Sequence, residues 1–191
     1  DTKGAGSIVV HEPRPSEAAY VIEDSKEGWV ELVRVVLESY AGHGKRPVNV
    51  DYSQIRPAGS PIRTFGGIAP GPAPLIDCIK NIDNVLQPRI GERISSGDIT
   101  DLMNVIGKCV VSGGVRRTAE LALGSADDSE YLELKDPEKN RDKLMAWRWA
   151  SNNSITASIG MDYSKVGEQT AKNGEPGYFW LENAKAYGRM K

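Results

Sequence analysis

The stretch that most constrains this chain is a 21-residue run, 55–75, which holds four glycines, five prolines and no acidic residue. Proline fixes one backbone angle and lacks an N–H donor, while glycine opens conformations closed to other residues, so the run cannot form a helix or a central strand. Structureless loops beyond about 12–15 residues are usually functional or disordered. We expect a shaped loop that carries Arg56 and Arg63 toward an anion; a purely structural connector is the alternative. The apolar residues expected to anchor this loop are Ile55, Ile62, Phe65, Ile68 and Leu75.

Composition sets limits on the function. The 24 Lys and Arg residues nearly balance the 26 Asp and Glu residues, which excludes a generally basic nucleic-acid binder. No apolar run approaches the roughly 20 residues of a membrane span, and no signal peptide is visible, so we expect a cytoplasmic protein with no membrane partner. The chain begins at Asp1 without methionine, and we interpret residues 1–191 as a single partial domain from a longer protein.

Hydrophobic spacing and capping residues predict helices over 26–40, 75–86, 99–110, 137–149 and 161–172. Runs typical of strands occupy 20–22, 48–50, 119–123, 155–159 and 178–181, and the remainder after 181 is predicted to be loop. Strands therefore alternate with helices, which favours an α/β fold with parallel pairing.

Two groups of residues are candidates for binding a nucleotide. Asp24 and Ser25 precede the first helix, where they either cap it or present a carboxylate to a ligand. Gly113, Gly114, Arg116 and Arg117 follow the third helix. A helix C-terminus repels anions, so phosphate binding there must come from the guanidinium groups and glycine amides; an ordinary helix end is the alternative.

Other polar residues give weaker signals. Asn152 and Asn153 could bond a ribose or a base, although asparagine is also frequent in turns. Cys78 and Cys109 are far apart in the sequence and occupy apolar helical positions, which favours buried reduced thiols over a disulfide. His11 and His43 are isolated, and neither cysteine has a neighbouring histidine, so no catalytic group or metal site is predicted.

Several motifs resemble one enzyme family. The loop closely resembles the large subunit of ribonucleotide reductases, and further motifs look like its adenosylcobalamin-dependent class II branch, nearest to the type that reduces ribonucleoside triphosphates. The matching segments follow the family's order over nearly the whole chain: 27–30, 55–62, 65–67, 71–75, 115–124, 148–154 and 173–177.

The resemblance implies a fold and a site. The family fold is a ten-stranded α/β barrel, and this chain resembles part of its first half. It would carry the site where a deoxynucleoside triphosphate effector selects the base to be reduced. Asp24 resembles the carboxylate that holds the effector's sugar hydroxyl. Arg56 resembles an arginine of the first specificity loop that binds the effector's phosphate. Residues 112–118 resemble the second loop, which relays the identity of the effector to the substrate base, with Arg116 as the contacting residue. Thr118, Asn152 and Asn153 are possible substrate-side residues.

The resemblance also implies what this chain lacks. The family makes deoxyribonucleotides for DNA replication by thiyl-radical chemistry with adenosylcobalamin. A thioredoxin-type dithiol is the reductant of the full enzyme. The radical cysteine would follow Lys191 and the first redox cysteine would precede Asp1, while Cys78 and Cys109 match neither. We therefore expect incomplete cobalamin binding and no reductase activity from this chain alone. The alternative is a stand-alone nucleotide-binding regulatory module without catalysis.

Overall fold

The computed structural model describes residue 2 and residues 4–63, 66–112 and 118–189. The chain forms two compact units, and the division falls within helix α3 (Ser96–Val110). We call the first the βαβ unit; it comprises Gly6–Ile94 and Val105–Thr118. The second, the three-stranded unit, comprises Asp1–Ala5, Ser95–Asn104 and Ala119–Lys191.

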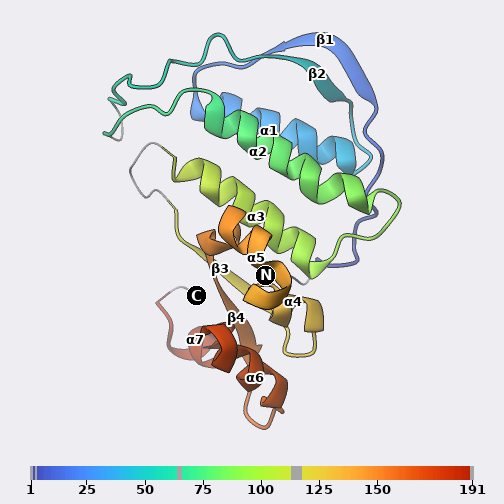
Figure 1. Cartoon of the computed structure of the whole chain (residues 1–191), viewed down its shortest axis with the longest axis vertical. Coiled ribbons are helices and arrows are strands. Elements are labelled where there is room, and N and C mark those ends of the chain that lie inside the picture. Colours follow the sequence, from blue (N-terminus) through green and yellow to red (C-terminus); the bar gives the residue numbers. More distant parts are fainter. Residues whose placement is uncertain (1, 3, 64–65, 113–117, 190–191) are drawn as a thin grey trace. The chain divides into compact units, whose positions relative to one another are not determined.

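In the βαβ unit, strand β1 (Pro15–Val21) pairs in parallel with β2 (Arg46–Asp51), and helix α1 (Lys26–Tyr40) connects them. Helix α2 (Ala73–Leu86) contacts α1 and continues into the short 3-10 helix η1 (Gln87–Arg89) (Figure 1). Apolar residues at helical spacing close the core between the two helices, because each buries one face against the other. The fully buried members include Leu32, Val36, Leu75 and Ile82.

Polar groups also join the elements of this unit. The Tyr40 hydroxyl donates to Asp83 Oδ1 at 2.8 Å, and Arg46 Nη2 lies 2.7 Å from Asp83 Oδ2. The Asp83 carboxylate of α2 therefore contacts both the end of α1 and the start of β2.

The loop between β2 and α2 is shaped, as its composition predicts. Ala69 N–H donates to Ser60 O at 2.7 Å, and Ile62 N–H donates to Gly67 O at 3.0 Å, which folds the loop back on itself. Gly67 has a φ of +87°, a conformation that side chains disfavour. The loop is shorter than predicted, because α2 already begins at Ala73.

The predicted anchors of this loop divide into three groups. Ile55 and Leu75 are buried, as expected, and Ile62 is half-buried. Ile68 is 58% exposed, so its prediction as an anchor was wrong; the loop closes through backbone hydrogen bonds at that point instead. Phe65 lies outside the described residues.

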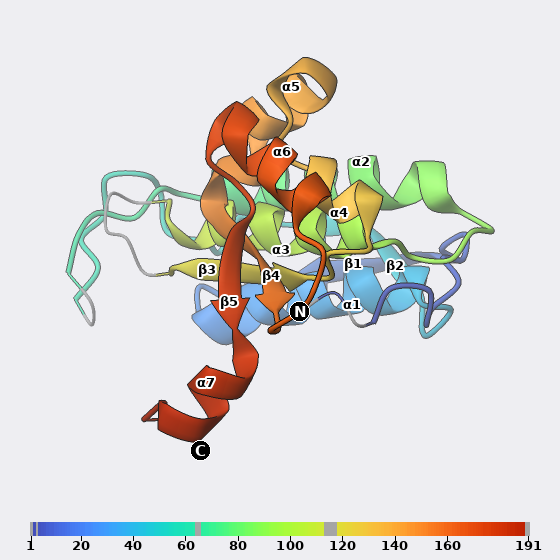
Figure 2. The ribbon, with the colours of Figure 1, turned by 90° about the horizontal axis from the view of Figure 1, so that it is seen from below.

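The three-stranded unit has strands β3 (Glu120–Gly124), β4 (Ser151–Ala157) and β5 (Gly177–Trp180), which are parallel neighbours in that order (Figure 2). Between β3 and β4 come α4 (Ser129–Glu133), α5 (Pro137–Ala146) and the 3-10 helix η2 (Arg148–Ala150). Helix α6 (Ser164–Asn173) connects β4 to β5. The parallel α/β prediction is therefore confirmed in both units.

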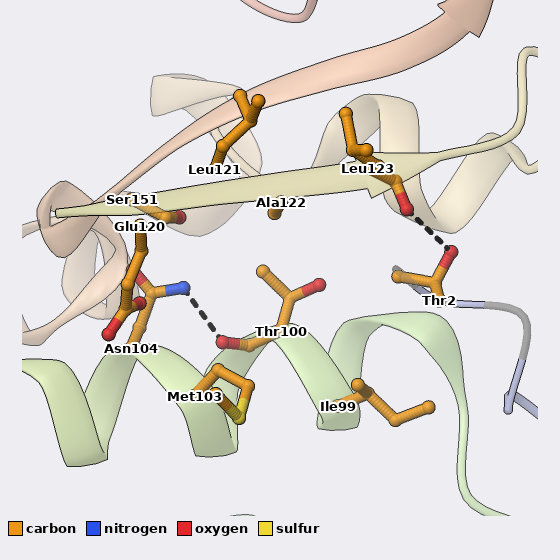
Figure 3. A pocket seen from close by; sticks show the side chains of 10 residues that line it. All are labelled: Thr2, Ile99, Thr100, Met103, Asn104, Glu120, Leu121, Ala122, Leu123 and Ser151. Carbon is orange, nitrogen blue, oxygen red and sulfur yellow. Dashed lines mark hydrogen bonds between the residues drawn. The ribbon is translucent and has the colours of Figure 1, made fainter. Parts of the chain in front are cut away.

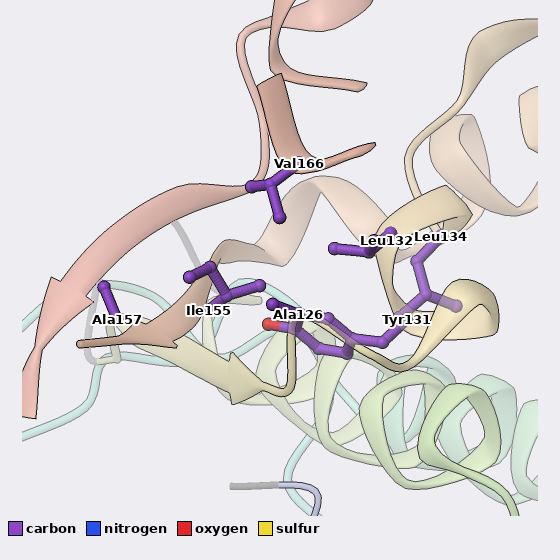
Figure 4. Close-up of a cluster of buried hydrophobic side chains, with 7 residues drawn as sticks. All are labelled: Ala126, Tyr131, Leu132, Leu134, Ile155, Ala157 and Val166. Atoms are coloured by element: carbon purple, nitrogen blue, oxygen red, sulfur yellow. The ribbon is translucent and has the colours of Figure 1, made fainter. Parts of the chain in front are cut away.

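Buried side chains from β4, α4 and α6 form the core of this unit around Tyr131 and Ile155 (Figure 4). The Tyr131 hydroxyl lies 2.7 Å from the Ala122 carbonyl oxygen and 3.0 Å from that of Ser154, so its polar end is satisfied within the core. The complete cluster is Ala126, Tyr131, Leu132, Leu134, Ile155, Ala157 and Val166.

Three predictions for this unit were wrong in detail. The helix predicted through residue 149 ends at Ala146, and η2 follows it. Asn152 and Asn153 belong to strand β4 and not to a turn before it. The segment predicted to be loop after residue 181 contains helix α7 (Leu181–Tyr187), which β5 enters directly (Figure 2).

Candidate nucleotide site

The topology of the βαβ unit brings Asp24 and Arg56 together. Val21 at the end of β1 pairs with Asp51 at the end of β2, and Asp24 and Arg56 each follow one of these two ends. In parallel sheets, the carboxyl ends of neighbouring strands meet at one edge, which is where α/β proteins bind ligands. Arg56 Nε donates to Asp24 Oδ2 at 2.6 Å, with both side chains partly exposed.

Ser25 acts as the N-cap of α1. Its Oγ accepts a hydrogen bond from Gly28 N–H at 3.0 Å, and its backbone is extended. The capping interpretation is therefore confirmed for Ser25. The Asp24 carboxylate instead accepts a hydrogen bond from Arg56. Gly28 is required at this turn, since a Cβ there would lie 2.6 Å from the Glu23 carbonyl oxygen.

Of the other predicted phosphate-binding residues, the structure describes only Arg63. Arg63 is exposed and directly precedes residues 64–65, which lie outside the described residues. Gly113, Gly114, Arg116 and Arg117 lie outside the described residues. Thr118 is half-buried and lies two residues before the start of β3 at Glu120.

The two asparagines of β4 differ in exposure. Asn152 is exposed, whereas Asn153 is 4% exposed. Asn153 N–H donates to Glu175 Oε2 at 3.1 Å, and its Oδ1 accepts from Ser151 Oγ at 2.8 Å. Lys135 Nζ lies 2.8 Å from the same Glu175 oxygen. The motif at 148–154 therefore meets the motif at 173–177 through Glu175.

Sequence reasoning missed a buried ionic network beside this strand. Asp101 of α3 is 1% exposed and Arg148 of η2 is 3% exposed. Arg148 Nε and Nη2 donate to the two Asp101 oxygens at 2.6 and 2.8 Å, and Trp147 Nε1 donates to Asp101 Oδ1 at 2.8 Å. Burial opposes ionisation of Asp101, but the hydrogen bonds and charge of Arg148, together with the charge of Lys143 and the hydrogen bond from Trp147, outweigh it and lower the Asp101 pKa. Asp101 was missed because it occupies a polar position of the predicted helix, and no pattern in the sequence indicates that it is buried.

A cavity of about 190 Å³ lies between α3 and β3 in the three-stranded unit (Figure 3). Asn104 Oδ1 and Glu120 Oε2 are buried beside it without a hydrogen-bond partner among the described residues. Burial raises the pKa of Glu120. Ser151 lines this cavity, whereas Asn152 and Asn153 do not. The lining residues are Thr2, Ile99, Thr100, Met103, Asn104, Glu120, Leu121, Ala122, Leu123 and Ser151.

Neither a metal site nor a membrane span occurs within the described ranges. These residues contain no group of three or more His, Cys, Asp or Glu side chains arranged to hold a metal ion. Every helix among them is too short or too polar to span a bilayer.

Comparisons with known proteins identify the family. The model of the B12-dependent ribonucleotide reductase insertion domain matches residues 6–86. The adenosylcobalamin-dependent ribonucleoside-triphosphate reductase of Euglena gracilis is 46% identical over 192 residues, covering 100% of this chain and 26% of that protein. The enzyme of the same name from Lactobacillus gasseri is 41% identical over 177 residues, covering 90% of this chain and 23% of that protein.

The fold also matches a solved structure. A crystal structure of a B12-dependent class II ribonucleotide reductase superimposes with a TM-score of 0.75 and 37% identity, over 86% of this chain and 23% of that one. The chain belongs to the class II, adenosylcobalamin-dependent ribonucleotide reductases. It spans about a quarter of the length of the curated relatives that it matches.

Proposed function

We propose that this chain carries the deoxynucleoside triphosphate effector site of a cobalamin-dependent ribonucleoside-triphosphate reductase. The observation that carries the proposal is the contact between Asp24 and Arg56 at the carboxyl edge of β1 and β2. Both residues, together with Ser25 and Arg63, fall inside the 6–86 segment matched by the insertion-domain model. The residues proposed for the first effector loop therefore all lie within the segment that matches the insertion domain.

The geometry suits a nucleotide with an exposed triphosphate. Arg56 uses Nε to hold Asp24, which leaves its Nη nitrogens as the donors for phosphate oxygens. Asp24 accepts through Oδ2, and its Oδ1 is the acceptor for a sugar hydroxyl. The ion pair fixes the carboxylate and the guanidinium before the ligand arrives, which reduces the ordering needed on binding.

The remaining predicted residues complete this proposal. Gly113, Gly114, Arg116 and Arg117 would form the second effector loop, and Thr118 would connect it to β3. On the substrate side, Asn152 is the better placed of the two asparagines, because the side chain of Asn153 is already hydrogen-bonded to Ser151.

We further propose that the whole protein reduces ribonucleoside triphosphates, with adenosylcobalamin supplying the radical and a thioredoxin-type dithiol supplying electrons. The described residues of this chain do not fit the cofactor. Two cavities among them measure about 190 and 410 Å³. The larger of these two falls near the lower end of the roughly 300–1,000 Å³ that drug-sized ligands occupy, and a corrinoid is larger than such ligands. We therefore propose that this chain alone does not catalyse reduction.

The test measures the sugar-hydroxyl contact directly. Each deoxynucleoside triphosphate and its 2′,3′-dideoxy counterpart are titrated into the chain by calorimetry. Loss of a hydrogen bond to a charged group costs about 1.5–3 kcal/mol, so the dideoxy compounds should bind at least about tenfold more weakly. Asp24→Ala should abolish that difference. Glu23→Ala, a change to the neighbouring exposed carboxylate, should preserve it. Equal binding of both compounds to the unchanged chain, or discrimination that survives in Asp24→Ala, would contradict the assignment.

A further inference from the structure

The cavity between α3 and β3 presents buried hydrogen-bond acceptors. Asn104 is 1% exposed, and its Oδ1 has no hydrogen-bond partner among the described residues. Glu120 Oε2 is also buried without a partner in that part of the chain. The two side chains line the same cavity, Asn104 from α3 and Glu120 from β3 (Figure 3). Because buried acceptors in proteins are ordinarily hydrogen-bonded, this pair requires a donor from elsewhere.

Several donors in the cavity wall are already used within the protein. Asn104 Nδ2 donates to the Thr100 carbonyl oxygen at 2.7 Å, and Thr100 Oγ1 donates to the Ser96 carbonyl oxygen at 2.9 Å. Ser151 Oγ donates to Asn153 Oδ1 at 2.8 Å. These three lining side chains therefore turn acceptor oxygens, and not donors, toward a ligand. Such a wall disfavours phosphates and carboxylates, which are acceptors themselves.

The charge of the wall favours a cation. Glu120 is the one titratable residue among the described residues that line the cavity. Burial raises the pKa of Glu120, which is the effect expected for a carboxylate that lacks a nearby positive charge. A positively charged ligand would supply that charge.

The size and the apolar part of the cavity limit the ligand further. The volume is about 190 Å³. For comparison, an apolar cavity of about 150 Å³ admits benzene. The ligand is therefore a small organic molecule, and much of its surface must be apolar. The apolar side chains of the wall are Ile99, Met103, Leu121, Ala122 and Leu123.

We propose that this cavity binds a small primary alkylammonium ion. An ammonium group has several N–H donors and no acceptor, so one group can donate to both Asn104 Oδ1 and Glu120 Oε2. The alkyl chain packs on the apolar wall. Water is the alternative donor. The site belongs to the three-stranded unit and uses none of the residues proposed for the effector, so either proposal can fail without the other.

The test compares two probes of nearly equal shape, n-butylammonium chloride and n-butanol. Each is titrated into the folded, isotope-labelled chain at constant ionic strength, and NMR follows the Asn104 side-chain amide and the backbone amides of Thr100, Glu120 and Ala122. We expect saturable shifts with n-butylammonium and a Kd in about the millimolar range, since so small a ligand binds weakly. n-Butanol lacks the charge that Glu120 pairs with, so it should bind at least about tenfold more weakly.

Two matched variants separate charge from shape. Glu120→Gln keeps the size of the side chain and removes its charge, so both probes should bind it equally weakly. Glu168→Gln makes the same change at an exposed position of α6 and should preserve the preference for n-butylammonium.

Three results would overturn the proposal. In the first, n-butylammonium causes no saturable shift in the unchanged chain, as expected if the cavity takes up water only. In the second, the unchanged chain binds both probes equally, which would make the site merely apolar. In the third, the preference for n-butylammonium survives in Glu120→Gln. Because the unchanged chain supplies the first two results, the test remains decisive even if a variant fails to fold.

Discussion

Asp24 and Arg56 are 32 residues apart in the sequence, yet Arg56 Nε donates to Asp24 Oδ2 at 2.6 Å. The contact follows from parallel pairing of β1 and β2, because each residue lies just beyond the carboxyl end of its strand. About a third of each side chain remains exposed. Such a pair is well placed to meet a ligand and poorly placed to stabilise the fold.

The first prediction concerns this division between binding and stability. Exposed ion pairs contribute roughly 0–1 kcal/mol, so Arg56→Ala should change the free energy of unfolding by less than about 1 kcal/mol. Urea denaturation followed by circular dichroism measures the effect. A loss of several kcal/mol would show that the pair is structural and would remove the argument that it is kept for a ligand.

The buried pair between Asp101 and Arg148 should behave in the opposite way. Removing one partner leaves the other as an uncompensated charge, at a cost of about 3–5 kcal/mol. We expect Arg148→Met to destabilise the chain by that amount in urea denaturation. Lys143→Met is the matched control, because Lys143 contacts the same carboxylate at 3.1 Å but is 47% exposed. Similar losses of unfolding free energy in both variants would contradict the claim that burial of the ion pair determines the cost of removing one partner.

The lowered pKa of Asp101 predicts how stability depends on pH. A carboxylate whose folded pKa lies below its unfolded value stabilises the fold above the unfolded pKa, near 3.9 for aspartate. That contribution is lost as the pH falls through the folded pKa, because the unfolded chain then binds the proton more readily. Denaturation from pH 7 down to acid should show stability decreasing below about pH 4. The same series on Asp101→Asn should show a shallower decrease; an unchanged slope would contradict the assignment.

Gly124 provides a test of core packing. A Cβ at this position would lie 2.2 Å from Tyr131 Cδ1, in the centre of the buried cluster. Overpacking of a core typically costs about 1–3 kcal/mol, so Gly124→Ala should lower the free energy of unfolding by at least that much. Gly167 in α6 has no atom within 4 Å of its added Cβ. Gly167→Ala should be neutral or stabilise by about 0.5–1 kcal/mol, since alanine favours a helix. The idea fails if the two substitutions have the same effect.

Local signals in the sequence predicted the βαβ unit well. Helix α1 spans the residues predicted for it, because Ser25 caps its start and apolar residues recur on one face. A loop was predicted over 55–75 because glycine and proline leave few alternatives, and in the structure it ends at residue 72, before α2. The meeting of Asp24 with Arg56 also follows from the predicted parallel pairing, once the strand ends are known.

Other features depend on contacts that a sequence does not display. Asp101 occupies an apparently ordinary polar position of an amphipathic helix, and only packing against η2 buries it beside Arg148. Helix α7 was missed because its residues have no strong apolar period, and none of them is buried. Asn153 was assigned to a turn on residue type, whereas pairing with Ala122 places it in β4.

Titration of the chain with dATP, dGTP, dTTP and dCTP by calorimetry tests the central claim most directly. We predict that at least one of them binds in the micromolar range, and that Arg56→Ala and Arg116→Ala each abolish this binding. Arg34→Ala is the control, because Arg34 pairs with Glu31 and Glu38 on the exposed surface of α1. It should bind as the unchanged chain does. A folded chain that binds none of the four nucleotides, or an Arg56→Ala variant that binds normally, would contradict the proposed effector site.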